Sequence, residues 1–249
     1  MDVGLGTTVA LTAVAAVAGC IDAIAGGGGL LTLPALLTAG VPAQLVLGTN
    51  KGQSVFGSAA ATFRFARAGR LTWRRSLPSF GAGFAGSLAG AALVTQLDAR
   101  ALRPLIIVLL CVAAVLVLLP RPRTVRRPTR PLATAIGLAL VIGAYDGFFG
   151  PGTGTLLIVG AMWLLGEAAD VASANAKVVN FASNLAAVAW FGAHGAILWA
   201  VSLPMAAGQF VGALVGAQLV LTRGSGVVRV AAVAVALAMV AKLTYGLVA

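Results

Sequence analysis

Long apolar runs recur along this chain and restrict the folds that it can adopt. A helix needs about 20 apolar residues to cross the ~30 Å hydrocarbon core of a bilayer, whereas barrel strands alternate apolar and polar residues. Most of the runs reach that length without alternating, which predicts an all-α integral membrane protein, a polytopic helical bundle. The runs cover residues 5–25, 30–39, 43–66, 77–96, 101–119, 132–148, 154–165, 170–193, 197–221 and 227–248.

Composition and charge support the same class. Of the 249 residues, 60% are hydrophobic and 9% are charged, against roughly 25% charged in soluble domains. The formal net charge of +11 suggests nucleic acid at first sight. However, the basic residues cluster in short loops between apolar runs, the pattern that sets membrane topology. We therefore expect a lipid bilayer around the chain and no nucleic-acid partner.

Two glycine-rich breaks interrupt the apolar runs, and the breaks resemble each other. Asp22 precedes Gly26, Gly27, Gly28 and Gly29, while Asp146 precedes the sequence Gly150-Pro151-Gly152-Thr153-Gly154. Glycine costs a helix about 1 kcal/mol relative to alanine, so each cluster should end its helix. The runs that follow, 30–39 and 154–165, are too short to span a bilayer. Each break therefore predicts a glycine-broken helix followed by a short half-helix.

The chain divides into two homologous halves, a first transmembrane repeat at 1–120 and a second at 132–249. A basic linker at 121–131 joins them, and its arginines are too costly to bury. A shift of 126 positions superposes many unusual residues of the two halves, more than chance would match. It places Gly40 on Gly166, Lys51 on Lys177, Ser54 on Asn180, Gly69 on Gly195, Trp73 on Trp199 and Pro78 on Pro204.

Each half has five elements, an odd number, which predicts inverted repeats. The positive-inside rule tests this orientation. Arg64, Arg67, Arg70, Arg74 and Arg75 surround the loop after the third element, and the linker is equally basic, so both should be cytoplasmic. The equivalent loop of the second half, 193–197, has no Lys or Arg and should face outward.

Rows of small residues predict close helix packing. Each row has a small residue at every fourth position, which makes a smooth helix face. We favour packing within one chain over a dimer seam, and a homodimer stays open. The rows are Ala82, Gly86 and Gly90 in the first half and Gly208, Gly212 and Gly216 in the second.

A broken helix in a membrane frees backbone groups that need partners. The N-terminus of a half-helix presents N–H donors and the positive end of a dipole, which favours an anion. The alternative is that the glycines only permit tight helix crossing. Because both breaks recur with their flanking residues, we favour a binding site over crossing alone.

Two intramembrane lysines, Lys51 and Lys177, need partners because their burial is costly. A bound anion would serve, and so would Asp22 and Asp146 as structural ion pairs or carriers of coupling protons. The sequence leaves these interpretations open. The candidate substrate-binding residues combine backbone donors, charge and polar side chains: Gly26, Gly27, Gly28, Gly29, Thr49, Asn50, Lys51, Gly152, Thr153, Gly154, Asn175, Lys177, Asn180 and Asn184.

No enzyme, metal or cofactor pattern stands out. Cys20 and Cys111 lie in apolar runs without metal-ligand spacing, and His194 is the single histidine. Gly52-Gln-Ser54 only superficially resembles an intramembrane protease motif. A nucleotide-binding motif is absent, so ATP is not expected to drive this chain directly. We predict no catalytic residues and no cofactor.

Two ordered motifs resemble the signatures of the TauE/SafE sulfite-exporter family. The first is Gly26-Gly-Gly-Gly29-Leu-Leu-Thr-Leu-Pro34 followed by Gly48-Thr49-Asn50-Lys51, and the second is Gly147-Phe-Phe-Gly150-Pro151-Gly152-Thr153-Gly154 followed by Ala176-Lys177. The resemblance covers nearly the whole chain and implies a multi-pass inner (plasma) membrane transporter of small anions. Where the family usually has Thr-Lys, this chain has Ala176-Lys177.

These observations predict a secondary transporter of sulfite, sulfonate or related organosulfur anions that works by alternating access between the two repeats. Protons or another ion are the candidates for coupling to transport. Two alternatives stay open, a channel-like anion pore and a non-transporting membrane scaffold or partner subunit. Packing alone would not require intramembrane lysines beside paired helix breaks, which argues against the scaffold.

Overall fold

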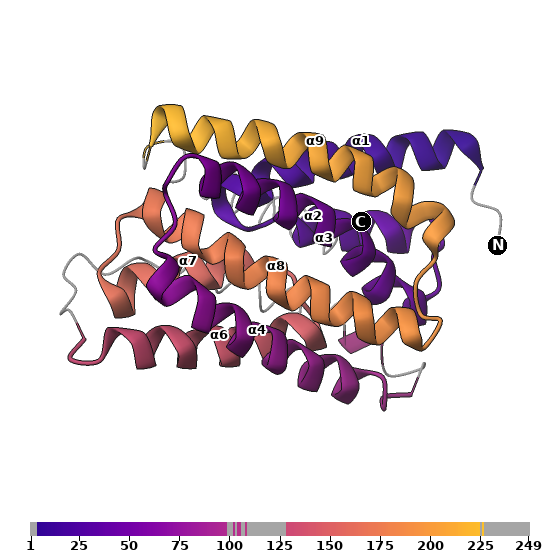
Figure 1. Cartoon of the computed structure of the whole chain (residues 1–249). Helices are drawn as coiled ribbons and strands as arrows, with labels where there is room; N and C mark the ends of the chain where they lie inside the picture. The colour runs from indigo at the N-terminus through magenta and orange to yellow at the C-terminus, as the bar shows by residue number, and fades with distance from the viewer. Residues whose placement is uncertain are drawn as a thin grey trace.

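The computed structural model describes residues 4–98 and 128–224, together with positions 102, 104, 105, 108 and 226. All of the regular elements in this part of the chain are helices (Figure 1). The predicted runs at 227–248 and most of 101–119, and the linker residues 121–127, lie outside the described residues.

Eight of the ten predicted runs fall within the described residues, and each is a helix. Most ends agree within two residues, but α4 begins at Trp73, before the predicted start at 77, because its first turn is polar. The helices are α1 (Leu5–Ala25), α2 (Gly29–Thr38), α3 (Ala43–Arg67), α4 (Trp73–Val94), α6 (Pro131–Phe148), α7 (Thr153–Leu165), α8 (Ala169–Ala193) and α9 (Trp199–Arg223).

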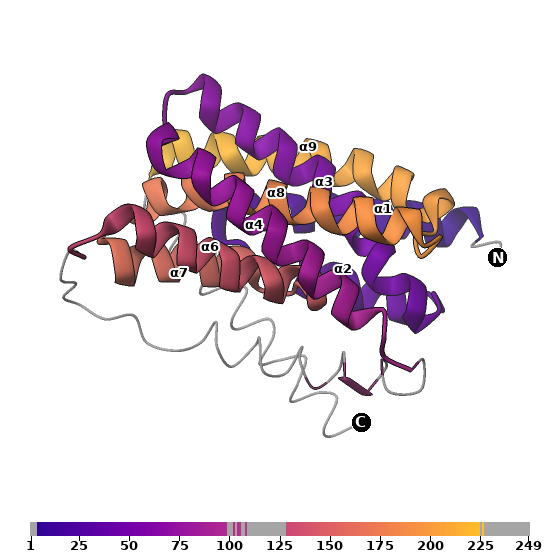
Figure 2. The ribbon, with the colours of Figure 1, turned by 60° about the horizontal axis from the view of Figure 1, so that its bottom comes forward.

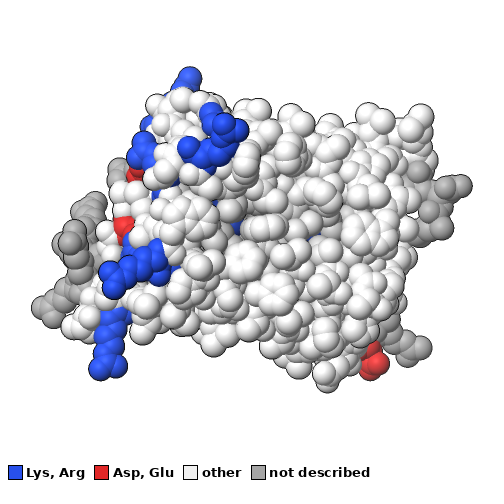
Figure 3. All heavy atoms as spheres, in the orientation of Figure 1, with Lys and Arg blue, Asp and Glu red and all other residues white. Residues whose placement is uncertain are grey.

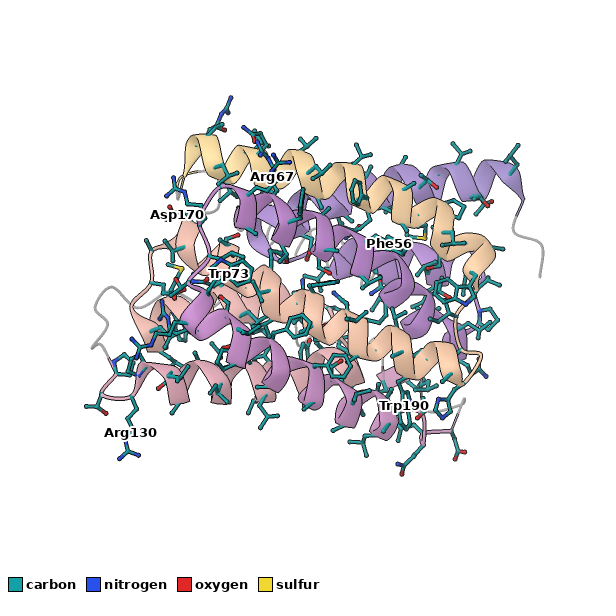
Figure 4. All side chains as sticks on the ribbon, viewed as in Figure 1. Phe56, Arg67, Trp73, Arg130, Asp170 and Trp190 are labelled. Atoms are coloured by element: carbon teal, nitrogen blue, oxygen red, sulfur yellow. The ribbon has the colours of Figure 1, made fainter. Side chains whose placement is uncertain are left out.

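Within the described residues, four helices are long and apolar enough to cross a membrane: α1, α4, α6 and α9. The helices α3 and α8 are each 25 residues long but carry more polar side chains, most of which are buried. The short helices α2 and α7 have 10 and 13 residues, as the breaks predicted. Large apolar side chains such as Phe56 and Val141 are exposed on the outside, as expected of a surface in lipid (Figure 4).

The two polar helices lie at the centre of the bundle. Helix α3 packs on α8, and the outer helices form two pairs, α1 with α9 and α4 with α6 (Figures 1 and 2). Each outer pair is closely packed because its glycines bring backbones together. A Cβ on Gly212 would overlap the backbone of Ala16, and one on Gly90 would overlap that of Ala144.

This packing confirms that the small-residue rows serve contacts within one chain. The glycines at 208, 212 and 216 all face α1, and those at 86 and 90 face α6. Ala82 is half-buried and packs in the apolar cluster that joins α6, α7 and α8. A dimer seam would therefore need other surfaces.

Basic side chains gather at one end of the molecule, and most of the remaining visible face is uncharged (Figure 3). Arg67, Trp73 and Arg130 lie at this basic end, and Trp190 lies at the opposite end (Figure 4). Helix α3 therefore runs toward the basic end, while α8 runs from Asp170 at the basic end toward Trp190 (Figure 4). The prediction that the arginine-rich loop and the linker share one side is thus consistent with where Arg67 and Arg130 lie.

Candidate functional site

The two glycine breaks meet in the middle of the bundle. Helix α1 ends at Gly26, whose φ of 81° is in the left-handed region that glycine adopts freely. Thr155 of α7 donates its N–H to the Gly26 carbonyl at 3.3 Å and its hydroxyl to the Ala25 carbonyl at 2.7 Å. A Cβ on Gly26 or Gly154 would overlap the backbone of the other glycine. The break in each half therefore contacts the break in the other.

Two buried ion pairs lie beside this crossing. Lys51 Nζ of α3 is 2.5 Å from Asp146 Oδ1 of α6, and Lys177 Nζ of α8 is 2.9 Å from Asp22 Oδ2 of α1. Each lysine therefore pairs with the aspartate that precedes the break in the other half. All four side chains of these pairs are buried or nearly so. The most exposed is that of Asp22, with 14% of its surface exposed. The structure thus contains the ion pairs that the sequence left as one interpretation.

Further donors stabilise each carboxylate. Asp22 accepts a hydrogen bond from the Gly28 N–H at 3.3 Å and one from Asn180 Nδ2 at 3.4 Å. Asp146 accepts bonds from the hydroxyls of Thr153, at 2.8 Å, and Ser183. These bonds matter because two buried charges are favourable only when their remaining hydrogen-bonding capacity is used. The pairs are therefore structural parts of the bundle as well as candidates for binding.

A small polar cavity lies where the breaks and the ion pairs meet. About 20 Å³ is open to the centre of a water-sized probe. That is room for about one water and too little for a polyatomic anion. Six lining residues come from each half of the chain: Asp22, Gly26, Gly29, Asn50, Lys51 and Ser54 from the first, and Asp146, Gly150, Thr153, Gly154, Asn180 and Asn184 from the second.

Residues with unused donors line this cavity. Among the described residues, the N–H groups of Gly29 and Gly154, at the starts of α2 and α7, donate no hydrogen bond. The hydroxyl of Ser54 accepts a bond from Gln53 Nε2 at 3.0 Å and donates to no described group. Helix N-termini favour anions through such N–H groups and the helix dipole. The cavity therefore combines the Lys51 ammonium group with free donors.

Amide side chains connect the cavity to the central helices. Asn184 Nδ2 donates to Asn180 Oδ1 within α8 at 3.0 Å, and to Ser58 Oγ of α3 at 3.4 Å. On the other side, Asn50 Oδ1 accepts a bond from the Thr32 hydroxyl at 2.5 Å. These contacts hold the amides in fixed orientations toward the cavity.

Ten of the sixteen residues predicted for binding, coupling or ion pairing line the cavity, and four of the others adjoin it. Lys177 lies behind Asp22, Gly28 donates to Asp22, and Gly27 and Gly152 form the turns of the two breaks. Thr49 and Asn175 lie elsewhere. Thr49 Oγ1 accepts the Leu198 N–H at 3.0 Å, and Asn175 Oδ1 accepts the Thr72 N–H at 2.9 Å.

Sequence reasoning did not assign Ser54, Gly150 and Ser183 to the site. A signal existed for the first two, because the 126-residue shift superposes Ser54 on Asn180, and Gly150 belongs to the second break. Ser183, which donates to Asp146, lies one helical turn after Asn180 and had only that spacing to mark it.

A separate charged cluster lies where α4 begins and α7 ends. Arg75 Nη2 is 2.6 Å from Glu167 Oε1, and Asn175 Nδ2 donates to Glu167 Oε1 at 3.2 Å. Burial raises the pKa of the Glu167 carboxyl above its ordinary value of 4.5, while Arg75 and Asn175 oppose that rise. No cluster of His, Cys, Asp and Glu in the described residues could hold a metal ion.

Comparison with known proteins places the chain among membrane transporters. The model of the family described as sulfite exporter TauE/SafE matches residues 11–243. No solved structure matches the chain. Three similar proteins carry transporter names: probable membrane transporter protein ORF9 of Sinorhizobium sp, 39% identical over 230 residues (91% of this chain, 88% of the relative); a probable membrane transporter protein of Haemophilus influenzae, 38% over 248 (98% and 97%); and YfcA of Escherichia coli K12, 38% over 235 (93% and 87%).

Proposed function

This chain belongs to the sulfite exporter TauE/SafE family, and on that premise we propose that it is a secondary transporter of sulfite, sulfonates or related organosulfur anions. The family and the fold show that the chain is a multi-pass membrane transporter. The chemistry of the cavity supports a small anion as its substrate.

The proposal rests on a polar cavity inside an apolar bundle, lined by Lys51 and by two free helix-start N–H groups, with Lys177 behind Asp22 at its edge. An anion would take the place of Asp146 on Lys51 or of Asp22 on Lys177 and accept bonds from Gly29, Gly154 and Ser54. The aspartates hold the lysines when no anion is bound. When an anion loads, they are the groups that would take up a coupling proton.

The arrangement of the repeats supports our proposal of alternating access. We treat residues 1–120 and 132–249 as inverted repeats because α3 and the equivalent helix α8 run in opposite directions (Figure 4). The crossed ion pairs also relate the halves to each other. With room for about one water, the cavity represents a closed form that must open to admit an anion. We place the basic end at the cytoplasmic face of the inner membrane.

Flux into proteoliposomes tests the proposal. We expect saturable uptake, with counterflow, of at least one anion among sulfite, sulfoacetate, taurine and phosphate. Lys51→Ala and Lys177→Ala should each lower flux at least tenfold, while Arg74→Ala, at an exposed arginine, should leave it unchanged. Because each single variant leaves an aspartate unpaired, Lys51→Ala/Asp146→Ala keeps the charge balance and should still transport poorly.

The results also separate the alternatives. Flux that neither saturates nor shows counterflow would indicate a channel-like pore. Absence of flux with tight copurification of a second protein would indicate a scaffold. Full flux and unchanged anion binding in both lysine variants would overturn the assignment of these residues to the site.

A further inference from the structure

The fourth helix of each half packs on the other half. Helix α4, from the first half, makes its extensive contacts with α6 and α8, and α9, from the second half, makes its own with α1 and α3. The described helices therefore group into lobe A, which is α1, α2, α3 and α9, and lobe B, which is α4, α6, α7 and α8. Figure 1 shows lobe A above lobe B.

The contacts inside each lobe are close and apolar. In lobe B, a Cβ on Gly86 would overlap the Leu140 carbonyl of α6, and in lobe A one on Gly208 would overlap the Thr12 carbonyl of α1. Backbones packed at this distance leave no room for sliding, since close-packed interiors do not deform continuously. The two exchanged helices, α4 and α9, each pack on the half to which they do not belong in sequence. Each is therefore fixed to the lobe that it joins.

Matching polar contacts hold the start of each exchanged helix. In lobe B, Asn175 accepts bonds from the Thr72 N–H and from the Ser76 hydroxyl at 3.0 Å. In lobe A, Thr49 accepts the Leu198 N–H, and Ser202 donates to the Thr49 carbonyl at 3.2 Å. The 126-residue shift superposes these two sets of residues. Thr49 and Asn175 thus tie helices together inside a lobe.

The interface between the lobes holds the buried charges, and among the described glycines a Cβ would overlap a backbone of the other lobe only at the crossing of Gly26 and Gly154. Its main contact is α3 on α8, with smaller contacts of α1 on α7 and α8. Both ion pairs cross it, and so does the bond from Asn184 to Ser58. The cavity takes its residues equally from the two lobes. One backbone crossing beside two ion pairs and a small void separates more readily than the rows of close backbone contacts inside each lobe.

From this contrast we infer that the moving bodies are the two lobes, each with one helix from the other half, and not the two sequence repeats. Opening the α3–α8 interface breaks the crossed ion pairs and exposes the cavity. The contacts of α4 with α6 and of α9 with α1 persist through the cycle. The effect on flux rests on the proposed transport function, while the rigid-body grouping does not.

Two pairs of cysteine substitutions, each with one member on α8, test the grouping. Both pairs are introduced into a background that carries Cys20→Ala and Cys111→Ala. Ser76→Cys/Asn175→Cys joins α4 to α8 inside lobe B, and Ser58→Cys/Asn184→Cys joins α3 to α8 between lobes. A short bismaleimide is the linker because sulfite cleaves disulfides. Each protein is compared with itself before linking.

We expect linking of 58 to 184 to lower flux at least tenfold and linking of 76 to 175 to change it less than twofold. If the sequence repeats were the moving bodies, the 76–175 link would join them and stop flux as well. That outcome would overturn the inference.

Spin labels on exposed residues give a readout that does not require transport. Val17 and Leu77 belong to one half but different lobes, whereas Leu77 and Val141 belong to different halves but one lobe. We expect a single narrow distance for 77–141, and for 17–77 a distance that changes with anion and pH. A fixed 17–77 distance with a variable 77–141 distance would overturn the grouping even in a protein with no measurable flux.

Discussion

Asp22 shows how strongly the buried charges depend on each other. Its carboxylate is the ion-pair partner of a lysine that has no exposed side-chain surface, and it also accepts the Gly28 N–H. Because an unpaired ammonium in an apolar bundle is costly, single and paired substitutions at this site should differ sharply.

Asp22→Ala is predicted to destabilise the protein by about 3–5 kcal/mol, since it leaves Lys177 unpaired. Asp22→Ala/Lys177→Ala should recover part of that loss. Asp98→Ala, at an exposed aspartate, should change stability by less than about 0.5 kcal/mol. Denaturant unfolding in detergent measures all three, and a double variant no more stable than the single one would contradict the pairing argument.

Ser54→Ala is predicted to weaken anion binding about five- to tenfold, the equivalent of one neutral hydrogen bond of about 1 kcal/mol. Its stability should change little, because Gln53 Nε2 retains its bond to Asn50 Oδ1 at 3.0 Å. The concentration dependence of flux checks the first expectation and thermal unfolding the second. An unchanged KM would remove Ser54 from the binding site.

At the scale of elements, the glycine break at Gly26 requires both a left-handed backbone conformation and close approach to another backbone. Gly40 has the first requirement without the second. Gly26 and Gly40 have nearly the same φ, 81° and 80°, but only Gly26 is in contact with another backbone. A Cβ at Gly40 would have no neighbour within 4 Å.

Gly40→Ala should therefore cost only the left-handed conformation, about 1–2 kcal/mol. Gly26→Ala should cost about 1–3 kcal/mol more, because the new methyl group overlaps Gly154. Unfolding free energies of the two variants give the difference directly. Equal losses would mean that the breaks do not need close approach.

The buried carboxyl of Glu167, in a loop at the basic end, predicts that the stability of the fold depends on pH. Burial raises the pKa of this carboxyl in the folded protein, so the folded state binds protons more tightly than the unfolded state. By linkage, the contribution of Glu167 to stability is fully present below its unfolded pKa and is lost as the pH rises through the folded pKa. Glu167→Gln should remove this fall, and Asp98→Asn should keep it. The free energy of unfolding of both variants, measured across that pH range, tests this expectation. A fall that persists in Glu167→Gln would contradict it.

The whole molecule has a basic end and an end without Lys or Arg in its loop 193–197. Residues 68 and 194 are equivalent under the 126-residue shift, and both are exposed. Inverted repeats require them to lie on opposite sides of the membrane.

In a background without native cysteines, Ala68→Cys should be protected from a membrane-impermeant maleimide in intact cells and react after lysis. His194→Cys should react in intact cells when the reagent has access to the outer face of the inner membrane. Labelling of both from one side would be incompatible with inversion and with the positive-inside assignment.

Much of the fold was predictable because its signals are local. Hydropathy gave the eight described helices, and the glycine clusters gave the starts of α2 and α7, since the free energies of burial and helix breaking depend on neighbouring residues. The duplication also marked Lys51, Lys177 and both aspartates as a matched set. Most of the cavity lining was therefore named in advance.

The sequence by itself determined that this is a helical membrane protein with paired breaks and buried charges. Only the tertiary structure decided that Lys51 pairs with Asp146 and Lys177 with Asp22, that Thr49 and Asn175 hold helix starts, and that α4 and α9 change sides. Pairing depends on which helix faces meet. Those faces meet through glycine contacts between residues far apart in the sequence, such as Gly90 with Ala144 and Gly212 with Ala16, which no local pattern encodes.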